Sequence, residues 1–97
     1  MSSWYGSIAD NPDGGSIIYR STKATLNAAM KSLSIEPRDR GVGVLIMHLG
    51  RVRTDMGGLD AQLSPEKSIT SLRRVIESAS RVKSARLFDF EGKEMPW

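Results

Sequence analysis

The sequence contains no cysteine and only one histidine, His48. Disulfides and thiolate metal sites are therefore excluded, and so is any site that needs several histidines. No apolar run approaches the roughly 18 residues that cross a bilayer, and the chain does not start with a basic segment followed by an apolar one. We expect no metal, no membrane partner and a cytoplasmic location, which a composition without cysteine also fits.

Two further features are absent. A glycine-rich phosphate loop is missing, because Gly41 and Gly43 lack the preceding strand and following helix that would make one. Charge of one sign is not concentrated either: the net charge is +3, but basic and acidic residues alternate along much of the chain. A mixed solvated surface is favoured over a nucleic-acid partner, for which the basic residues between 73 and 83 are the best candidates.

What the chain does contain is an alternation of helical and extended patterns. Pro37 and the glycine-rich turn over residues 11–15 mark two of the boundaries, and Ser64-Pro65-Glu66 is typical of a helix start. The elements that we expect are a loop over 1–15, a helix over Ser16–Glu36, a strand over 42–47, a loop over 51–63, a helix over 64–80 and a strand over 86–90.

This order predicts an α/β fold. The run from Val42 to Met47 is almost entirely apolar, which is typical of a strand covered on both faces in a parallel sheet. Two parallel strands joined through a helix need cover on both faces and both edges. We therefore expect two helices and two or three strands that form part of a larger, doubly wound parallel sheet.

Tyr19 and Lys23 are the most informative pair of residues. On a helix, positions four apart lie one turn apart on one face. A nearby cation favours the phenolate of a tyrosine, which then exchanges a proton with a substrate oxygen nearer neutral pH. Alone, such a pair is more often an exposed tyrosine beside a solvated lysine, so its neighbours must decide.

Those neighbours follow a recognisable order. A Ser2-Ser3-Trp4-Tyr5-Gly6 loop comes first, Tyr19-xxx-Lys23 opens the long helix, and the buried strand runs into the segment His48–Met56. Together they resemble the C-terminal half of a short-chain dehydrogenase/reductase. The subgroup that is most similar is the C-factor-like carbonyl reductases, judged from Gly6-Ser7-Ile8, Gly14-Gly15 and the segment 54–58.

The resemblance implies catalytic roles by position. Tyr19 resembles the general acid/base, Lys23 the residue that lowers the tyrosine pKa and binds the nicotinamide ribose, and Ser3 the serine that hydrogen-bonds the substrate oxygen. Ser3 lies sixteen residues before Tyr19, slightly farther than usual, and a Gly14-Gly15 turn would absorb the extra length. Ser7 is the alternative catalytic serine, or a hydroxyl that stabilises the loop.

The resemblance also implies the cofactor, NAD or NADP, and a small carbonyl or alcohol substrate. Gly50, Val52 and Thr54 resemble positions that contact the nicotinamide or the phosphates, as does Lys23 for the ribose. A hydroxyl that only stabilises a turn is the other interpretation of Thr54. His48 is interpreted as structural rather than catalytic.

Residues 1–97 are then expected to be one partial domain that lacks the N-terminal dinucleotide-binding half. On this interpretation the chain descends from an oxidoreductase but is inactive alone, because most of the cofactor-binding surface is missing. The alternative is a non-catalytic module that forms homo-oligomers through the helix Ser16–Glu36.

Overall fold

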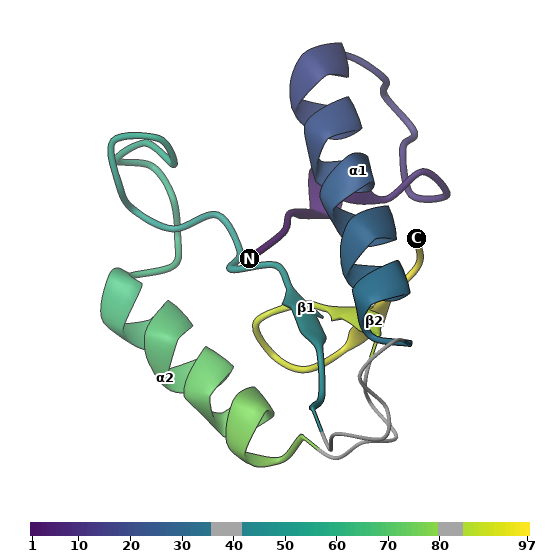
Figure 1. Cartoon of the computed structure of the whole chain (residues 1–97). Helices are drawn as coiled ribbons and strands as arrows, with labels where there is room; N and C mark the ends of the chain where they lie inside the picture. Colours follow the sequence, from purple (N-terminus) through teal and green to yellow (C-terminus); the bar gives the residue numbers. More distant parts are fainter. Residues whose placement is uncertain (36–41, 80–84) are drawn as a thin grey trace.

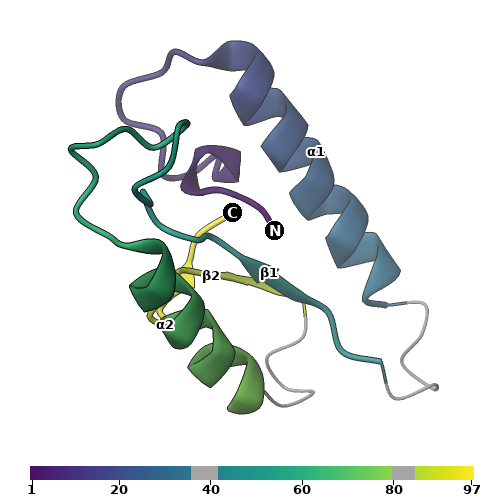
Figure 2. The same ribbon diagram turned by 90° about the vertical axis from the view of Figure 1, so that its left-hand side faces the viewer.

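The computed structural model describes residues 1–35, 42–79 and 85–97, which form a three-stranded sheet flanked by two long helices (Figure 1). In chain order the elements are the 3-10 helix η1 (Trp4–Gly6), helix α1 (Ile17–Leu33), strand β1 (Leu45–Met47), helix α2 (Pro65–Glu77), strand β2 (Arg86–Phe88) and strand β3 (Glu94–Met95). Helices α1 and α2 lie on opposite sides of the sheet (Figure 2). This arrangement confirms the predicted α/β class, as part of a Rossmann-like fold.

The sheet has the order β1-β2-β3. Strands β1 and β2 are parallel, with Ile46 opposite Leu87 and Met47 opposite Phe88, so the predicted parallel pairing is confirmed. Strand β3 is antiparallel to β2 and forms the edge. The sheet thus has three strands, within the predicted number of two or three.

Strands β1 and β2 each send alternate side chains to opposite faces of the sheet. Met47 and Phe88 pack with Leu72 and Val75 of α2 in one apolar cluster. Their neighbours Ile46 and Leu87, which are also buried, belong to the opposite face. The nearly continuous apolar pattern of β1 therefore reflects burial on both sides.

Helix α2 begins as its sequence predicts. The Ser64 hydroxyl accepts a hydrogen bond from the Lys67 N–H at 3.2 Å, and Pro65 occupies the first turn. Hydrogen bonds from its own backbone N–H and from Ser64 lower the pKa of Glu66 in that turn. The helix ends at Glu77 rather than Ser80; Ser80 lies outside the described residues.

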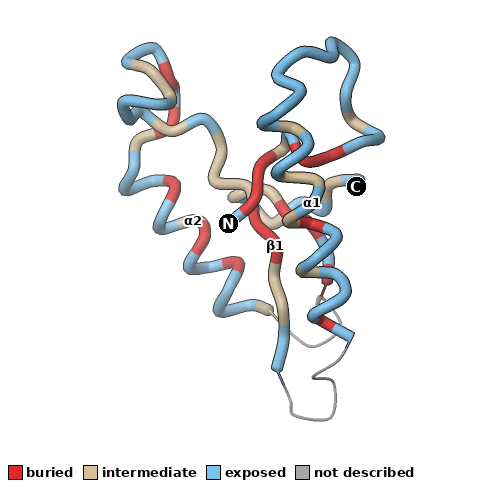
Figure 3. Tube along the Cα trace, turned by 45° about the horizontal axis from the view of Figure 1, so that its top comes forward, coloured by how far each residue is buried: buried red, intermediate tan, exposed pale blue. Residues whose placement is uncertain are grey.

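Helix α1 is shorter than the predicted Ser16–Glu36 helix. Ser16 adopts a left-handed conformation with φ 45° and makes no side-chain cap, so the helix starts at Ile17. It ends at Leu33, and the predicted stop at Pro37 lies outside the described residues. Asn27 is its only fully buried residue, and most of the helix surface is exposed (Figure 3).

The predicted strands were too long at one end. Val42 to Val44 precede β1 without joining it, and β2 stops at Phe88, where the Asp89 carboxylate accepts the N–H groups of Glu91 and Lys93 in a turn. Gly14 and Gly15 both have positive φ, as a tight turn before α1 requires. Neither of the two described helices is long and apolar enough to cross a bilayer.

Candidate active site

The N-terminal segment lies against both the sheet and helix α1. The Ser2 N–H donates to the Met47 carbonyl at 2.8 Å, and Ser2 forms a parallel bridge with His48. The segment therefore runs beside β1 on the side away from β2. Residues Trp4–Gly6 then turn into η1, which packs against α1. As a result the serine loop, the tyrosine helix and the carboxyl end of β1 meet in one place.

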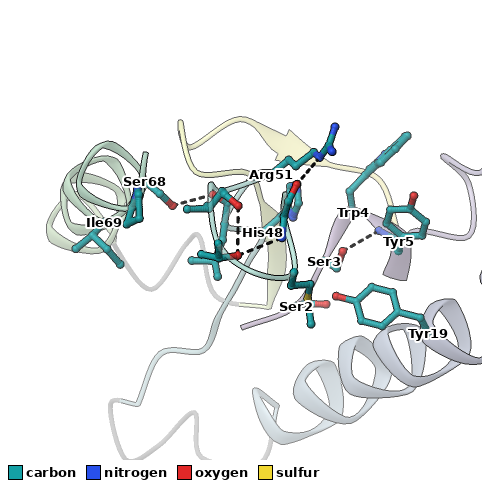
Figure 4. Close-up of a pocket in the computed structure, with 16 residues that line it drawn as sticks. Ser2, Ser3, Trp4, Tyr5, Tyr19, His48, Arg51, Ser68 and Ile69 are labelled. Carbon is teal, nitrogen blue, oxygen red and sulfur yellow. Dashed lines mark hydrogen bonds between the residues drawn. The ribbon is translucent and has the colours of Figure 1, made fainter. Parts of the chain in front are cut away.

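A pocket of about 680 Å³ opens at this meeting point (Figure 4). Ligands in open α/β folds bind outside the carboxyl ends of the strands, and this pocket has that position. Its lining comes from the N-terminal segment (Ser2, Ser3, Trp4, Tyr5), from Tyr19, from the segment after β1 (His48–Val52, Thr54, Met56, Gly57) and from the start of α2 (Pro65, Ser68, Ile69).

The structure brings Ser3 and Tyr19 to the same pocket. Ser3 is buried, and its hydroxyl accepts the N–H of Tyr5 at 3.2 Å. Tyr19 is 40% exposed, and its ring extends from α1 toward the Ser2–Ser3 segment (Figure 4). The Tyr19 ring also packs edge-on against Tyr5, with 5.8 Å between ring centroids.

Lys23 follows Tyr19 by one helical turn, as the sequence spacing predicts. Its ammonium nitrogen lies 5.5 Å from the centroid of the Tyr19 ring, although Lys23 itself does not line the pocket. Ser7, the alternative catalytic serine, does not line the pocket either. It is buried, and its hydroxyl accepts the N–H of Asp10 at 3.0 Å, which stabilises the loop.

The three predicted cofactor residues after β1 also line the pocket. Gly50 has φ +80°, and a β-carbon there would lie 2.7 Å from Leu63 and 2.9 Å from Phe90, so the chain needs glycine at this turn. The Thr54 hydroxyl donates to the Val52 carbonyl at 3.3 Å and accepts the Gly57 N–H at 3.2 Å. Thr54 therefore both stabilises its own turn and lines the pocket.

Arg51 closes the loop that carries Val52 and Thr54. Its guanidinium binds both carboxylate oxygens of Asp60, at 2.9 and 3.0 Å, and donates to the Gly57 carbonyl at 2.9 Å. A β-carbon at Gly57 would lie 1.7 Å from the Val52 carbonyl oxygen, so only glycine fits. The predicted loop over residues 51–63 is therefore a loop that these contacts of Arg51 close.

His48 lies at the pocket wall, at the end of β1. Burial lowers the pKa of His48, and nearby Asp89 opposes this shift with a smaller effect. The imidazole is therefore held neutral. No group of three or more potential metal ligands occurs among residues 1–35, 42–79 and 85–97.

Sequence reasoning missed three polar residues around the pocket. The Ser2 hydroxyl donates to the Asn27 side chain, and the buried Ser68 hydroxyl donates to the Leu49 carbonyl at 2.8 Å. Ser68 thereby attaches the start of α2 to the segment after β1. For Asn27 a signal was available, because it continues the four-residue spacing of Tyr19 and Lys23 on one helix face.

Known proteins resemble this chain in both sequence and structure, although no family model matches it. It is 43% identical over 97 residues to C-signal of Myxococcus xanthus, covering 100% of this chain and 58% of that protein. Carbonyl reductase Sniffer of D. melanogaster superposes with a TM-score of 0.96 and 36% identity, covering 100% of this chain and 39% of that one. An NADP-bound short-chain dehydrogenase/reductase from Burkholderia multivorans gives a TM-score of 0.84 at 34% identity, covering 100% and 42%.

The fold and these relatives define an α/β class of protein whose named members include a carbonyl reductase and a short-chain dehydrogenase/reductase. More narrowly, the chain belongs to the short-chain dehydrogenases/reductases, the family that its serine loop and Tyr19-xxx-Lys23 resemble. It spans about half the length of the curated relatives it matches, and this partial coverage fits the C-terminal half of such a protein.

The half-buried, neutral His48 predicts a pH dependence of folding. Because its pKa is lower in the folded than in the unfolded protein, the unfolded protein binds more protons as pH falls below about 6.5. The free energy of unfolding should therefore decrease from about pH 7.5 to about pH 5.5. Urea unfolding curves at several pH values measure it. His48→Gln should flatten this dependence, and an unchanged slope in that variant would contradict the assignment.

Proposed function

We propose that the pocket is the active site of a short-chain dehydrogenase/reductase that interconverts carbonyls and alcohols with NAD or NADP. The observation that carries the proposal is that the hydroxyl-bearing residues Ser3 and Tyr19 line one pocket, although they come from a loop and a helix. The relatives that carry the names carbonyl reductase and dehydrogenase support the same chemistry.

In this proposal Tyr19 is the general acid/base. Reduction of a carbonyl develops negative charge on its oxygen, and two hydroxyl donors aimed at that oxygen stabilise the charge. Tyr19 donates its proton to the oxygen, and Ser3 holds the oxygen by a hydrogen bond. The Lys23 ammonium nitrogen lies 5.5 Å from the centroid of the Tyr19 ring, which supports a role for Lys23 beside the reacting phenol.

The residues present fit the nicotinamide end of a dinucleotide. Gly50, Val52 and Thr54 border the pocket beside Tyr19, and these residues would hold the ring and its carboxamide, while Lys23 would bind the ribose. When bound, the nicotinamide supplies the hydride. Proteins of this family with NADP or NADPH bound are among the structures similar to this chain, which supports a nicotinamide nucleotide.

The remaining wall favours a small, uncharged substrate. Trp4, Leu49, Met56 and Ile69 provide apolar surface, and the one formally charged side chain at the wall, Arg51, is paired with Asp60. An isolated carboxylate or phosphate would find no unpaired cationic side chain among the described wall residues. We therefore propose an apolar carbonyl compound or the corresponding alcohol.

We further propose that these 97 residues are one partial domain without the dinucleotide-binding half, and are inactive on their own. We expect a weak interaction with NADPH, because the adenosine and pyrophosphate have no glycine-rich cradle in this sequence. Titration of the chain followed by NADPH fluorescence measures it. A dissociation constant below about 100 μM would contradict this part of the proposal.

Catalytic roles are tested best in a fusion in which the cofactor-binding part of a related carbonyl reductase precedes this chain. Tyr19→Phe should lower kcat for ketone reduction by about 10²–10⁴-fold, since the proton donor is lost. Ser3→Ala should lower it by about 10²–10³-fold. NADPH absorbance follows the reaction. Ser34→Ala, at a buried serine that does not line the pocket, is the control and should stay near wild type. A larger loss in Ser7→Ala than in Ser3→Ala would transfer the serine role to Ser7.

A second candidate function is a non-catalytic module that assembles through α1. The observation that favours it is the exposure of large apolar side chains on and beside this helix, including Ile17 at 78% and Ile18 at 82%. Such exposure is typical of a surface that another protein covers. A second copy of this chain is the occupant that we propose.

If α1 mediates assembly, light scattering should show a dimer of the 97-residue chain. Ile18→Glu should shift the dimer to monomer, because a charge would be buried in the interface. Ile76→Glu, on the exposed side of α2, is the matched control and should stay dimeric. A compact monomer for the wild-type chain across concentrations would end this proposal.

A further inference from the structure

One face of α1 carries a polar row. Tyr19, Lys23 and Asn27 are spaced by four residues, so they follow one another along the helix axis. Asn27 is 2% exposed, whereas the other described residues of α1 are at least partly accessible. A buried amide must be hydrogen-bonded to be tolerated, and its partners show what it holds.

Both polar atoms of the Asn27 side-chain amide form hydrogen bonds. Its side-chain oxygen accepts the Ser2 hydroxyl, and its side-chain nitrogen donates to the Gly6 carbonyl at 3.2 Å. These two partners bracket the loop that carries Ser3. The amide of one helix residue therefore binds both sides of the proposed catalytic serine.

The contact at Gly6 is also sterically close. A β-carbon at Gly6 would lie 2.7 Å from the Asn27 amide nitrogen and 3.0 Å from the β-carbon of Lys23. The loop therefore approaches the helix as closely as a glycine backbone permits. Ser2 is further attached to β1 through the Met47 carbonyl, so the loop has little freedom to shift.

We propose that Asn27 is a positioning residue that sets the distance between the Ser3 loop and Tyr19. Asn27 does not line the pocket and acts through the loop that it binds. An asparagine suits this task because its amide offers a donor and an acceptor in one rigid plane. The catalytic meaning of the inference rests on the proposed function, but the structural part is independent of it.

The ring contact between Tyr5 and Tyr19 reports on the distance between the Ser3 loop and helix α1. Tyr5 belongs to η1 and Tyr19 to α1, and their ring centroids are 5.8 Å apart. In the wild-type chain a nuclear Overhauser cross-peak between the two rings is expected. Asn27→Leu keeps the size of the side chain and removes both hydrogen bonds, so the cross-peak should disappear.

Three further variants separate positioning from folding. Ser2→Ala removes one of the two bonds and should weaken the cross-peak, and Gly6→Ala should abolish it by pushing the loop away from the helix. Ser34→Ala is the matched control, since Ser34 is buried near the same helix and its hydroxyl donates to the Lys31 carbonyl. Slow exchange of the His48 N–H, which pairs with Phe88 across the sheet, shows that a variant is folded.

The outcomes are distinct. A full cross-peak in folded Asn27→Leu overturns the inference; if that variant does not fold, an unchanged cross-peak in Ser2→Ala overturns it. In the fusion protein, Asn27→Leu should lower kcat about tenfold or more with little change in KM. Misplacement of catalytic groups slows the chemical step more than it weakens substrate binding. A lost cross-peak together with an inactive wild-type fusion would reject the proposed function and leave the positioning role standing.

Discussion

The site depends on how Ser2 joins the helix to the sheet. Its backbone N–H binds the Met47 carbonyl of β1, and its hydroxyl binds Asn27 of α1. Helix α1 buries little of its own surface, and the element that it packs against most closely is η1. A polar contact, rather than an apolar core, therefore aligns α1 with the pocket. Such contacts are directional, since a hydrogen bond weakens steeply when its angle changes.

The opposite side of the molecule is built differently. Helix α2 packs on the sheet through Leu72 and Val75, which contact Met47 and Phe88. Apolar packing of this kind stabilises without fixing the position of a polar group. On that side the Ser68 hydroxyl fixes the position of α2 relative to the segment after β1, because it donates a hydrogen bond to the Leu49 carbonyl just before the Gly50 turn. Both helices thus contribute one buried hydroxyl or amide that locates a pocket segment.

Much of the fold could be predicted because its signals are local. The apolar run before His48 indicates a buried parallel strand, and Ser64-Pro65-Glu66 supplies the cap of α2. The start of α1 was predicted one residue early because Ser16 takes a left-handed conformation that nothing in its neighbours reveals. Strand β3 pairs over two residues, which is too short for an alternating pattern.

The site was predictable only in part, for a similar reason. The order of Ser3, Tyr19 and Thr54 along the chain was enough to group them, and the structure places them around one pocket. The hydrogen bonds of Asn27 join positions that lie 21 and 25 residues apart, and no spacing rule connects them. Arg51 shows the same limit. Nothing in the sequence around this exposed arginine indicates which two residues its guanidinium binds.

The length of α1 has a mechanical consequence. Tyr19 and Asn27 are eight residues apart, which corresponds to about 12 Å along a helix axis. A helix anchored at Asn27 behaves as a stiff lever, so a tilt of about 5° at the anchor displaces the Tyr19 end by about 1 Å. Displacements of that size are enough to change a rate by about two orders of magnitude. Substitutions in the distant half of α1 can therefore act on the pocket by tilting the helix, without touching a residue that lines it.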